Sequence, residues 1–188
     1  MDRRKALKSI GIGFGAITAT SSVVSLFQSC QKSSNWSPVF LSNEEFDIVS
    51  KLMDLIIPTT DIPGAIDLKL PEFGDAYISA VFDNNAKEMF KNGLNEFINK
   101  AKSETGKSSV KSISIKEWDD QLAKYLKSDL EVNKEAKSFA IRLRRITVQA
   151  FRINEYIAEN ILAYDPVPGR QEGCVDLEQA TGGKAWSI

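Results

Sequence analysis

The stretch NKEAKSFAIRLRRITVQAFRINEYIAENIL, from Asn133 to Leu162, decides the fold of this chain. Apolar residues recur in it every three or four positions, as on one face of an α-helix: Phe139, Leu143, Ile146, Ala150, Ile153, Ile157 and Ile161. At about 1.5 Å per residue, an unbroken helix of this length would extend roughly 45 Å and cross a small domain. The charged residues beside the stripe are costly inside a bilayer, so we expect a core helix rather than a membrane span.

The residues after this helix are expected to form a folded loop. Pro166 and Pro168 cannot continue a helix, whereas Gly169 and Gly173 permit positive φ angles. A long loop in a compact domain is usually functional, and aromatic and arginine side chains often anchor interfaces. We therefore predict a partner interface in this tail and the loop 58–65, with these tail residues: Tyr164, Pro166, Pro168, Gly169, Arg170 and Trp186. The alternative is that the tail, including Trp186, covers the chain's own helices.

Shorter helices are expected before the long one. Two capping boxes, Ser42-Asn43-Glu44-Glu45 and Ser114-Ile115-Lys116-Glu117, mark the starts of two helices. Pro71 suits the first turn of another, which runs to about Phe82 and is ended by Asn84-Asn85, and a further helix carries an apolar stripe from Phe90 to Ala101. No alternating strand pattern is convincing. The predicted fold is an all-α, irregular helical bundle of about five helices around one long C-terminal helix, with a Pro/Gly-rich C-terminal tail.

The composition excludes several kinds of active site. The 188 residues include no histidine, which rules out Ser-His-Asp triads, histidine-ligated metals and haem attachment through CxxCH. The two cysteines are too few for an iron–sulfur cluster, and no glycine-rich nucleotide loop occurs. We therefore predict no catalytic, cofactor-binding or metal-binding residue in this chain.

Some chemically suggestive residues have simpler interpretations. The carboxylates that could be drawn as a cation site are interpreted as helix caps: Asp61, Asp67, Glu72 and Asp75. Cys174 stands beside Val175 and is expected to be a small buried residue, although a disulfide with Cys30 is the alternative in an oxidising compartment. The basic cluster on the long helix is expected to meet a protein partner rather than a small anion: Arg142, Arg144, Arg145 and Arg152.

Residues 1–30 have the features of an export signal. A basic start is followed by a weakly apolar run from Ile10 to Leu26 and then by small and polar residues. Asp2-Arg3-Arg4-Lys5-Ala6-Leu7-Lys8 resembles the twin-arginine motif, with Asp and Ala in place of the usual Ser and Phe. Arg3 and Arg4 are its key pair. The alternative is an ordinary secretory signal with two adjacent arginines.

Leu26-Phe27-Gln28-Ser29-Cys30 resembles a lipoprotein box, in which Cys30 is acylated and anchors the chain to a membrane. The alternative is a free cysteine just beyond a conventional cleavage site. Either reading predicts a periplasmic chain with a linker at 31–40 and one helical domain at 41–188. Removing the residues before Cys30 leaves 20 basic and 24 acidic residues, a net charge of about −4, so nucleic acid is not the expected partner.

Three segments together resemble the gluconate 2-dehydrogenase subunit 3 family. They are LIIPTTDIPGA at 55–65, RRITVQAF at 144–151, and YDPVPG at 164–169 followed by Gly173-Cys174-Val175. The resemblance implies a cofactor-free small subunit that helps a large subunit to mature and to leave the cell. That large subunit would contain FAD and belong to the glucose-methanol-choline type, with a c-type cytochrome, carrying haem c, as the usual electron acceptor.

The sequence leaves a second function open, a free-standing, lipid-anchored extracytoplasmic binding protein. It also does not name the sugar or sugar acid, because substrate contacts would lie in the other subunit.

Overall fold

The computed structural model describes residues 36–127, 133–165, 169 and 173–187. The chain divides into two units, Met1–Trp36 and Ser37–Ile188. The predicted export signal and Cys30 therefore lie outside the described residues. The second unit begins at Ser37, a few residues before the domain start expected at Leu41.

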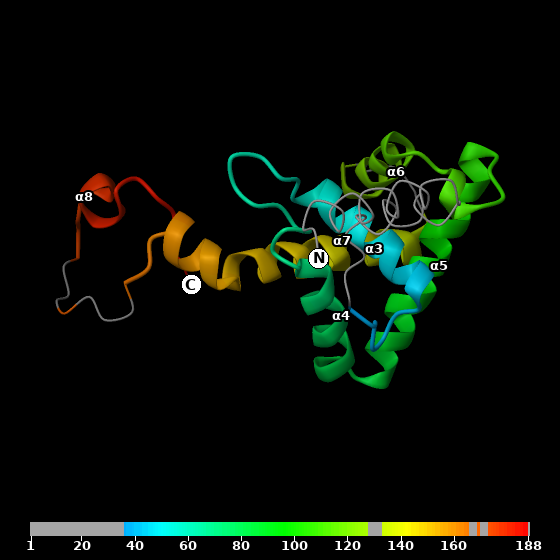
Figure 1. Cartoon of the computed structure of the whole chain (residues 1–188), viewed down its shortest axis with the longest axis horizontal. Coiled ribbons are helices and arrows are strands. Elements are labelled where there is room, and N and C mark those ends of the chain that lie inside the picture. The colour runs from blue at the N-terminus through cyan, green and yellow to red at the C-terminus, as the bar shows by residue number, and fades with distance from the viewer. Residues whose placement is uncertain (1–35, 128–132, 166–168, 170–172, 188) are drawn as a thin grey trace, which may run out of the picture. The chain divides into compact units, whose positions relative to one another are not determined.

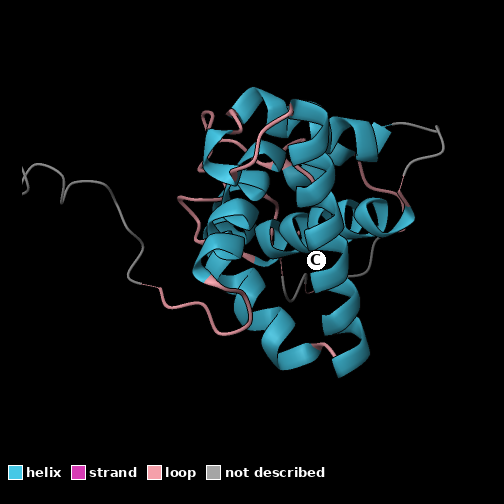
Figure 2. Ribbon diagram, turned by 90° about the vertical axis from the view of Figure 1, so that its right-hand side faces the viewer, coloured by secondary structure: helices cyan, strands magenta, loops and turns pink. Residues whose placement is uncertain are grey.

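Within the described residues, this second unit is built from helices (Figures 1 and 2). This confirms the prediction of an all-α irregular bundle. The main helices are α3 (Asn43–Ile56), α4 (Leu70–Val81), α5 (Asn84–Thr105), α6 (Ile115–Lys127) and α7 (Lys134–Ile153). There are three short elements as well: the 3-10 turn η2 (Val110–Ser112) between α5 and α6, and, after α7, the π-helical turn η3 (Ile157–Ile161) and the helix α8 (Leu177–Thr181).

The helix ends follow the capping chemistry of the sequence. Ser42 and Glu45 form the predicted capping box of α3, because each side chain accepts a hydrogen bond from the other residue's backbone N–H. Asn84-Asn85, expected to end a helix, instead begins α5, because the Asp83 carboxylate accepts the Ala86 N–H and caps a new helix there.

Helix α7 lies at the centre of the bundle and contacts α3, α4, α5 and α6. Its buried stripe includes the predicted Phe139, Leu143, Ile146 and Ala150. Phe139 meets two aromatic rings of α5, with ring centroids 5.1 Å from Phe90 and 5.5 Å from Phe97. These contacts bury large aromatic surfaces, the main source of stability in a core of this size.

Helices α5 and α7 pack tightly against each other at Gly93. A Cβ atom at this position would lie 2.8 Å from the Glu135 carbonyl oxygen and 2.8 Å from the Phe139 Cβ. Neither neighbour is the end of a flexible side chain, so a larger residue would push the helices apart. Glycine at 93 therefore sets the spacing of the aromatic contacts.

The prediction of a single long helix from Asn133 to Leu162 is wrong in one respect. The helix α7 ends at Ile153, and Asn154 interrupts it. This residue has an extended backbone conformation, and its side chain accepts the Tyr156 N–H at 3.1 Å. Asparagine competes for backbone hydrogen bonds in this way and so interrupts helices. Ile153, expected on the buried stripe, is consequently 53% exposed, whereas Ile157 beyond the break is buried.

A buried carboxylate ties the start of the unit to α4. Asp75 is 1% exposed and accepts three backbone N–H bonds, from Val39 at 2.6 Å, Phe40 at 3.1 Å and Leu41 at 2.9 Å. It lies inside α4 rather than at a helix start, so its interpretation as a helix cap is wrong. The Phe40 ring also packs edge-on against Phe90.

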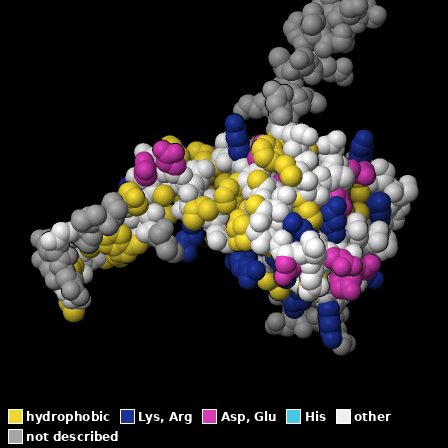
Figure 3. Space-filling view, turned by 90° about the horizontal axis from the view of Figure 1, so that it is seen from below, with side chains coloured by type: hydrophobic (Ala, Val, Ile, Leu, Met, Phe, Trp, Pro, Cys, Tyr) yellow, Lys and Arg dark blue, Asp and Glu magenta, His cyan; other side chains and the backbone are white. Residues whose placement is uncertain are grey.

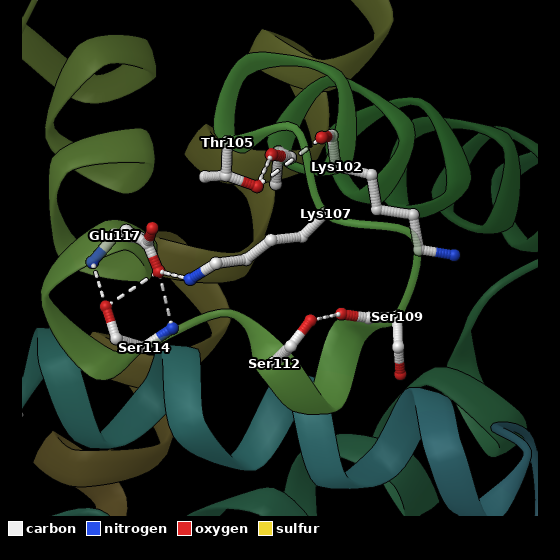
Figure 4. A network of polar contacts seen from close by, with 8 residues as sticks. Lys102, Thr105, Lys107, Ser109, Ser112, Ser114 and Glu117 are labelled. Atoms are coloured by element: carbon white, nitrogen blue, oxygen red, sulfur yellow. Dashed lines mark hydrogen bonds and ion pairs between the residues drawn. The ribbon is translucent and has the colours of Figure 1, made fainter.

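A second polar network joins the α5–α6 connection to the start of α6 (Figure 4). The Glu117 carboxylate accepts hydrogen bonds from Lys107 Nζ and from the Ser114 N–H and hydroxyl groups. The Ser114 hydroxyl accepts the Glu117 N–H in return, which completes the predicted capping box. The Lys107 hydrogen bond is the largest of the causes that lower the pKa of Glu117 from 4.5 to about 2.

Asp75→Ala should lower the free energy of unfolding by about 3 kcal/mol, because it leaves three backbone N–H groups without their acceptor. Asp75→Asn should cost less, since it keeps one acceptor oxygen. Urea denaturation followed by circular dichroism measures both, with the exposed Asp119→Ala as a control expected to change stability by less than about 0.5 kcal/mol. Equal stability of Asp75→Ala and Asp119→Ala would contradict the anchoring role.

The lowered pKa of Glu117 predicts a specific pH dependence. The folded state favours the charged form, so the stabilisation is present above pH 4.5 and is lost as the pH falls towards about 2. Glu117→Gln should therefore lower the urea midpoint at pH 7 and differ little from wild type near pH 2. The exposed Glu88→Gln is the control, and an equal loss at both pH values would refute the assignment.

Candidate functional site

The tail after η3 folds back on itself. The Ala163 N–H donates to the Ala185 carbonyl at 2.8 Å, and the Ser187 N–H donates to the Ala163 carbonyl at 2.8 Å. Ala163 and Trp186 thereby form an isolated parallel bridge. We call residues 163–187 the arm (orange to red in Figure 1). Its two ends are thus held together at its base.

Within the arm, α8 is fixed by local capping. The Asp176 carboxylate accepts the N–H groups of Glu178 and Gln179, and Gly182 ends the helix with a φ of 62°. Thr181 is the one buried residue among the arm residues that the structure describes. The arm therefore depends on backbone hydrogen bonds and caps rather than on burial in the bundle.

The arm exposes large apolar side chains. Tyr164 is 56% exposed and Trp186 is 47% exposed, and Val175 and Leu177 are exposed as well. Figure 3 shows hydrophobic side chains on the surface of this part of the chain. Cys174 is also exposed, so the expectation of a buried cysteine is wrong; the arm offers it no core in which to pack.

The structure covers part of the predicted interface. It places Tyr164, Gly169 and Trp186 in the arm, and Gly169 has the positive φ that its loop requires. Pro166, Pro168 and Arg170 lie outside the described residues, as do the export pair Arg3 and Arg4. Tyr164, Gly169 and Trp186 are exposed, whereas Gly64 and Ala65 of the loop 58–65 are buried.

The loop 58–65 is closed by its own hydrogen bonds. Thr59 donates its hydroxyl to Asp67 at 2.6 Å, and the Gly64 N–H donates to the same carboxylate at 3.2 Å. A Cβ at Gly64 would lie 2.4 Å from the Thr59 backbone nitrogen, so the tight loop requires glycine. Asp67 therefore stabilises this loop and is not the expected helix cap.

The Asp67 carboxylate also affects a neighbouring acid. Burial is the main cause that raises the pKa of Asp54, and the negative charge of Asp67 raises it further.

A pocket lies between the residues that follow the loop 58–65 and those that follow α7. Asp67, Leu68 and Lys69 form one wall of a cavity of about 400 Å³, and residues after the Asn154 break form the other wall: Asn154, Glu155, Tyr156, Glu159 and Asn160. The cavity thus lies between the segment just after the loop 58–65 and the segment just before the arm.

The four arginines expected to act as one cluster divide into two groups. Arg142 lies over the Phe82 ring at 5.6 Å and donates to the Ala86 carbonyl, so it faces α4 and α5. Arg144, Arg145 and Arg152 line a separate groove on the outer face of α7, which the sequence analysis did not distinguish.

The described residues contain no group of three or more cysteine and carboxylate side chains placed to hold a metal ion. None of the helices described here is sufficiently long and apolar to cross a membrane.

Comparison with known proteins assigns the chain to a family. The family model of gluconate 2-dehydrogenase subunit 3 matches residues 43–169, which span all five main helices and the first part of the arm. Neither the curated proteins nor the solved structures gave a significant match. Because the family model covers more than half of the sequence, the chain belongs to the gluconate 2-dehydrogenase subunit 3 family, a family of dehydrogenase subunits.

Proposed function

We propose that this chain is the non-catalytic small subunit of a periplasmic, flavin-dependent sugar or sugar-acid dehydrogenase. It assists the maturation and stability of an FAD-containing large subunit of the glucose-methanol-choline type and carries that subunit through the twin-arginine export route. A c-type cytochrome accepts the electrons, and acylated Cys30 holds the complex at a membrane.

The exposed arm is the observation that carries this proposal. An isolated chain gains nothing from leaving Tyr164 and Trp186 about half exposed on a segment braced by its own hydrogen bonds. A preformed segment loses less conformational entropy when it binds, and buried aromatic anchors contribute about 2 kcal/mol or more each to an interface. The arm is therefore suited to docking on a partner subunit.

The export signal supports the same partner. Twin-arginine export moves folded proteins, yet a small helical chain without a cofactor can be exported unfolded by the general route. An FAD subunit must fold around its cofactor before it crosses the membrane. A signal on this chain would therefore serve the complex rather than this subunit alone.

Changing Arg3→Lys and Arg4→Lys together should retain both this chain and the flavin subunit in the cytoplasm. The charge of the signal is unchanged, so only the arginine pair itself is tested. Dehydrogenase activity and immunoblots of periplasmic fractions report the result. Lys5→Arg with Lys8→Arg is the matched control and should leave export intact.

Normal periplasmic dehydrogenase activity in the Arg3→Lys, Arg4→Lys variant would exclude joint export. Purification of the exported wild-type chain without any flavoprotein would instead favour a free-standing, lipid-anchored binding protein. The intact mass of the same material tests the anchor, since a chain that does not begin at an acylated Cys30 is not lipidated.

A further inference from the structure

Helix α7 has a second, outward face with an unusual composition. Ile141 is 51% exposed, Val148 38% and Ile153 53%, and these residues recur along one side of the helix. With Leu126 of α6 and three arginines they line an open groove of about 730 Å³, which we call the α7 groove: Leu126, Ile141, Arg144, Arg145, Val148, Gln149, Arg152 and Ile153. Most surface helices present a polar outer face, so this one is an exception.

Among the described residues, no carboxylate forms an ion pair with the arginines of the α7 groove. The ion pairs between described residues involve lysines only, and Arg144, Arg145 and Arg152 take part in none of them. Helix α7 carries six basic residues and one acidic residue, Glu135, whereas the whole chain has a net charge of −1. The positive charge is therefore concentrated on this face, which would attract a partner surface that carries carboxylates.

We propose that the α7 groove binds a segment of the dehydrogenase's flavin subunit that presents aliphatic side chains flanked by aspartate or glutamate. This inference rests on the proposed function and extends it to a second surface besides the arm. Apolar contact would cover Ile141, Val148 and Ile153. Bidentate pairing of carboxylates with the arginines at the rim would fix the register.

The groove leads towards the arm along the chain. Ile153 is the last residue of α7, and the Asn154 break, the η3 turn and then the arm follow it in the chain. Of the fourteen large apolar side chains that are exposed among the described residues, eight lie between Ile141 and Trp186. Figure 3 shows basic side chains beside hydrophobic ones on the side of the bundle from which the arm extends. One partner could cover both surfaces.

Other occupants fit this groove less well. A small amphiphilic anion would remain largely in solvent, because small-molecule sites enclose most of their ligand and the described lining of this open groove comes from α6 and α7 alone. An anionic membrane is flat and cannot fill a concave groove. A second copy of the chain that docked through α7 would bring the same arginines together, and this helix offers one carboxylate, Glu135, against its six basic residues.

The test is co-expression of the full chain with the flavin subunit, followed by affinity purification and measurement of the dissociation constant. Arg144→Glu with Arg145→Glu should weaken the complex by about tenfold or more, because each arginine would be replaced by a charge that repels the partner's carboxylates. Both positions are exposed and glutamate is a good helix former, so the fold should persist. Lys111→Glu with Lys116→Glu is the control, with the same charge change on exposed residues outside the groove.

The apolar part is tested by Ile141→Gln with Val148→Gln, which should also weaken the complex. Met89→Gln is the control, since Met89 is 51% exposed, like Ile141, but does not line the α7 groove. If the glutamate pair loses its helical circular dichroism, Arg144→Gln with Arg145→Gln replaces it and should still weaken binding while the fold is retained.

The outcomes separate the two proposals. A wild-type complex whose affinity is unchanged by either groove variant would overturn this inference and leave the proposed function intact. A wild-type chain that binds no flavin subunit would overturn both. The groove variants could instead lose only self-association, or only binding to phosphatidylglycerol vesicles. Either result would also overturn the inference about the α7 groove, because the occupant would then be a second copy or a membrane.

Discussion

The close crossing of α5 and α7 is the constraint on which the bundle depends. Gly93 lets α7 approach until its backbone and the Phe139 Cβ lie within contact distance of α5. Only at this spacing can Phe139 meet both Phe90 and Phe97, and Phe97 in turn meets Trp118 and Tyr125 of α6. One aromatic cluster thus joins three helices. Because Phe139 belongs to this cluster, α7 cannot rotate about its own axis.

That fixed orientation divides α7 into two faces with different roles. The buried face carries Leu143, Ile146 and Ala150 into the core. The opposite face must then present Ile141, Val148 and three arginines to solvent or to a partner. A folding requirement on one side of the helix therefore positions a binding surface on the other. The helix breaks at Asn154, and the short element η3, with Ile157 buried, separates α7 from the arm.

The sequence predicted the positions of the main helices, because local patterns determine where helices begin and end. Capping boxes at Ser42 and Ser114, the proline at the start of α4 and the spacing of apolar residues located the main helices, because these signals act within a few residues. It could not reveal the role of Asp75, whose three backbone donors lie 34 to 36 residues away in the chain. Such contacts exist only after the helices have packed.

The same limit explains the errors in the candidate site. An isoleucine at 153 continues a helical stripe in the sequence, and only the hydrogen bond from Tyr156 to Asn154 shows that the stripe ends there. Cys174 was expected to be buried because its neighbours are apolar, but those neighbours lie in an arm with little core of its own. The arginines of α7 are close together in the sequence, and only the structure shows that Arg142 contacts Phe82, apart from the others.

If the arm serves the partner, the helical bundle should fold without it. The most direct measurement compares the full chain with a chain truncated before Tyr164, by circular dichroism, thermal unfolding and copurification with the flavin subunit. We expect the truncated chain to keep its helical spectrum and a similar midpoint of unfolding, and to lose the flavoprotein. Unfolding of the truncated bundle, or its copurification with the flavoprotein at wild-type yield, would contradict the account.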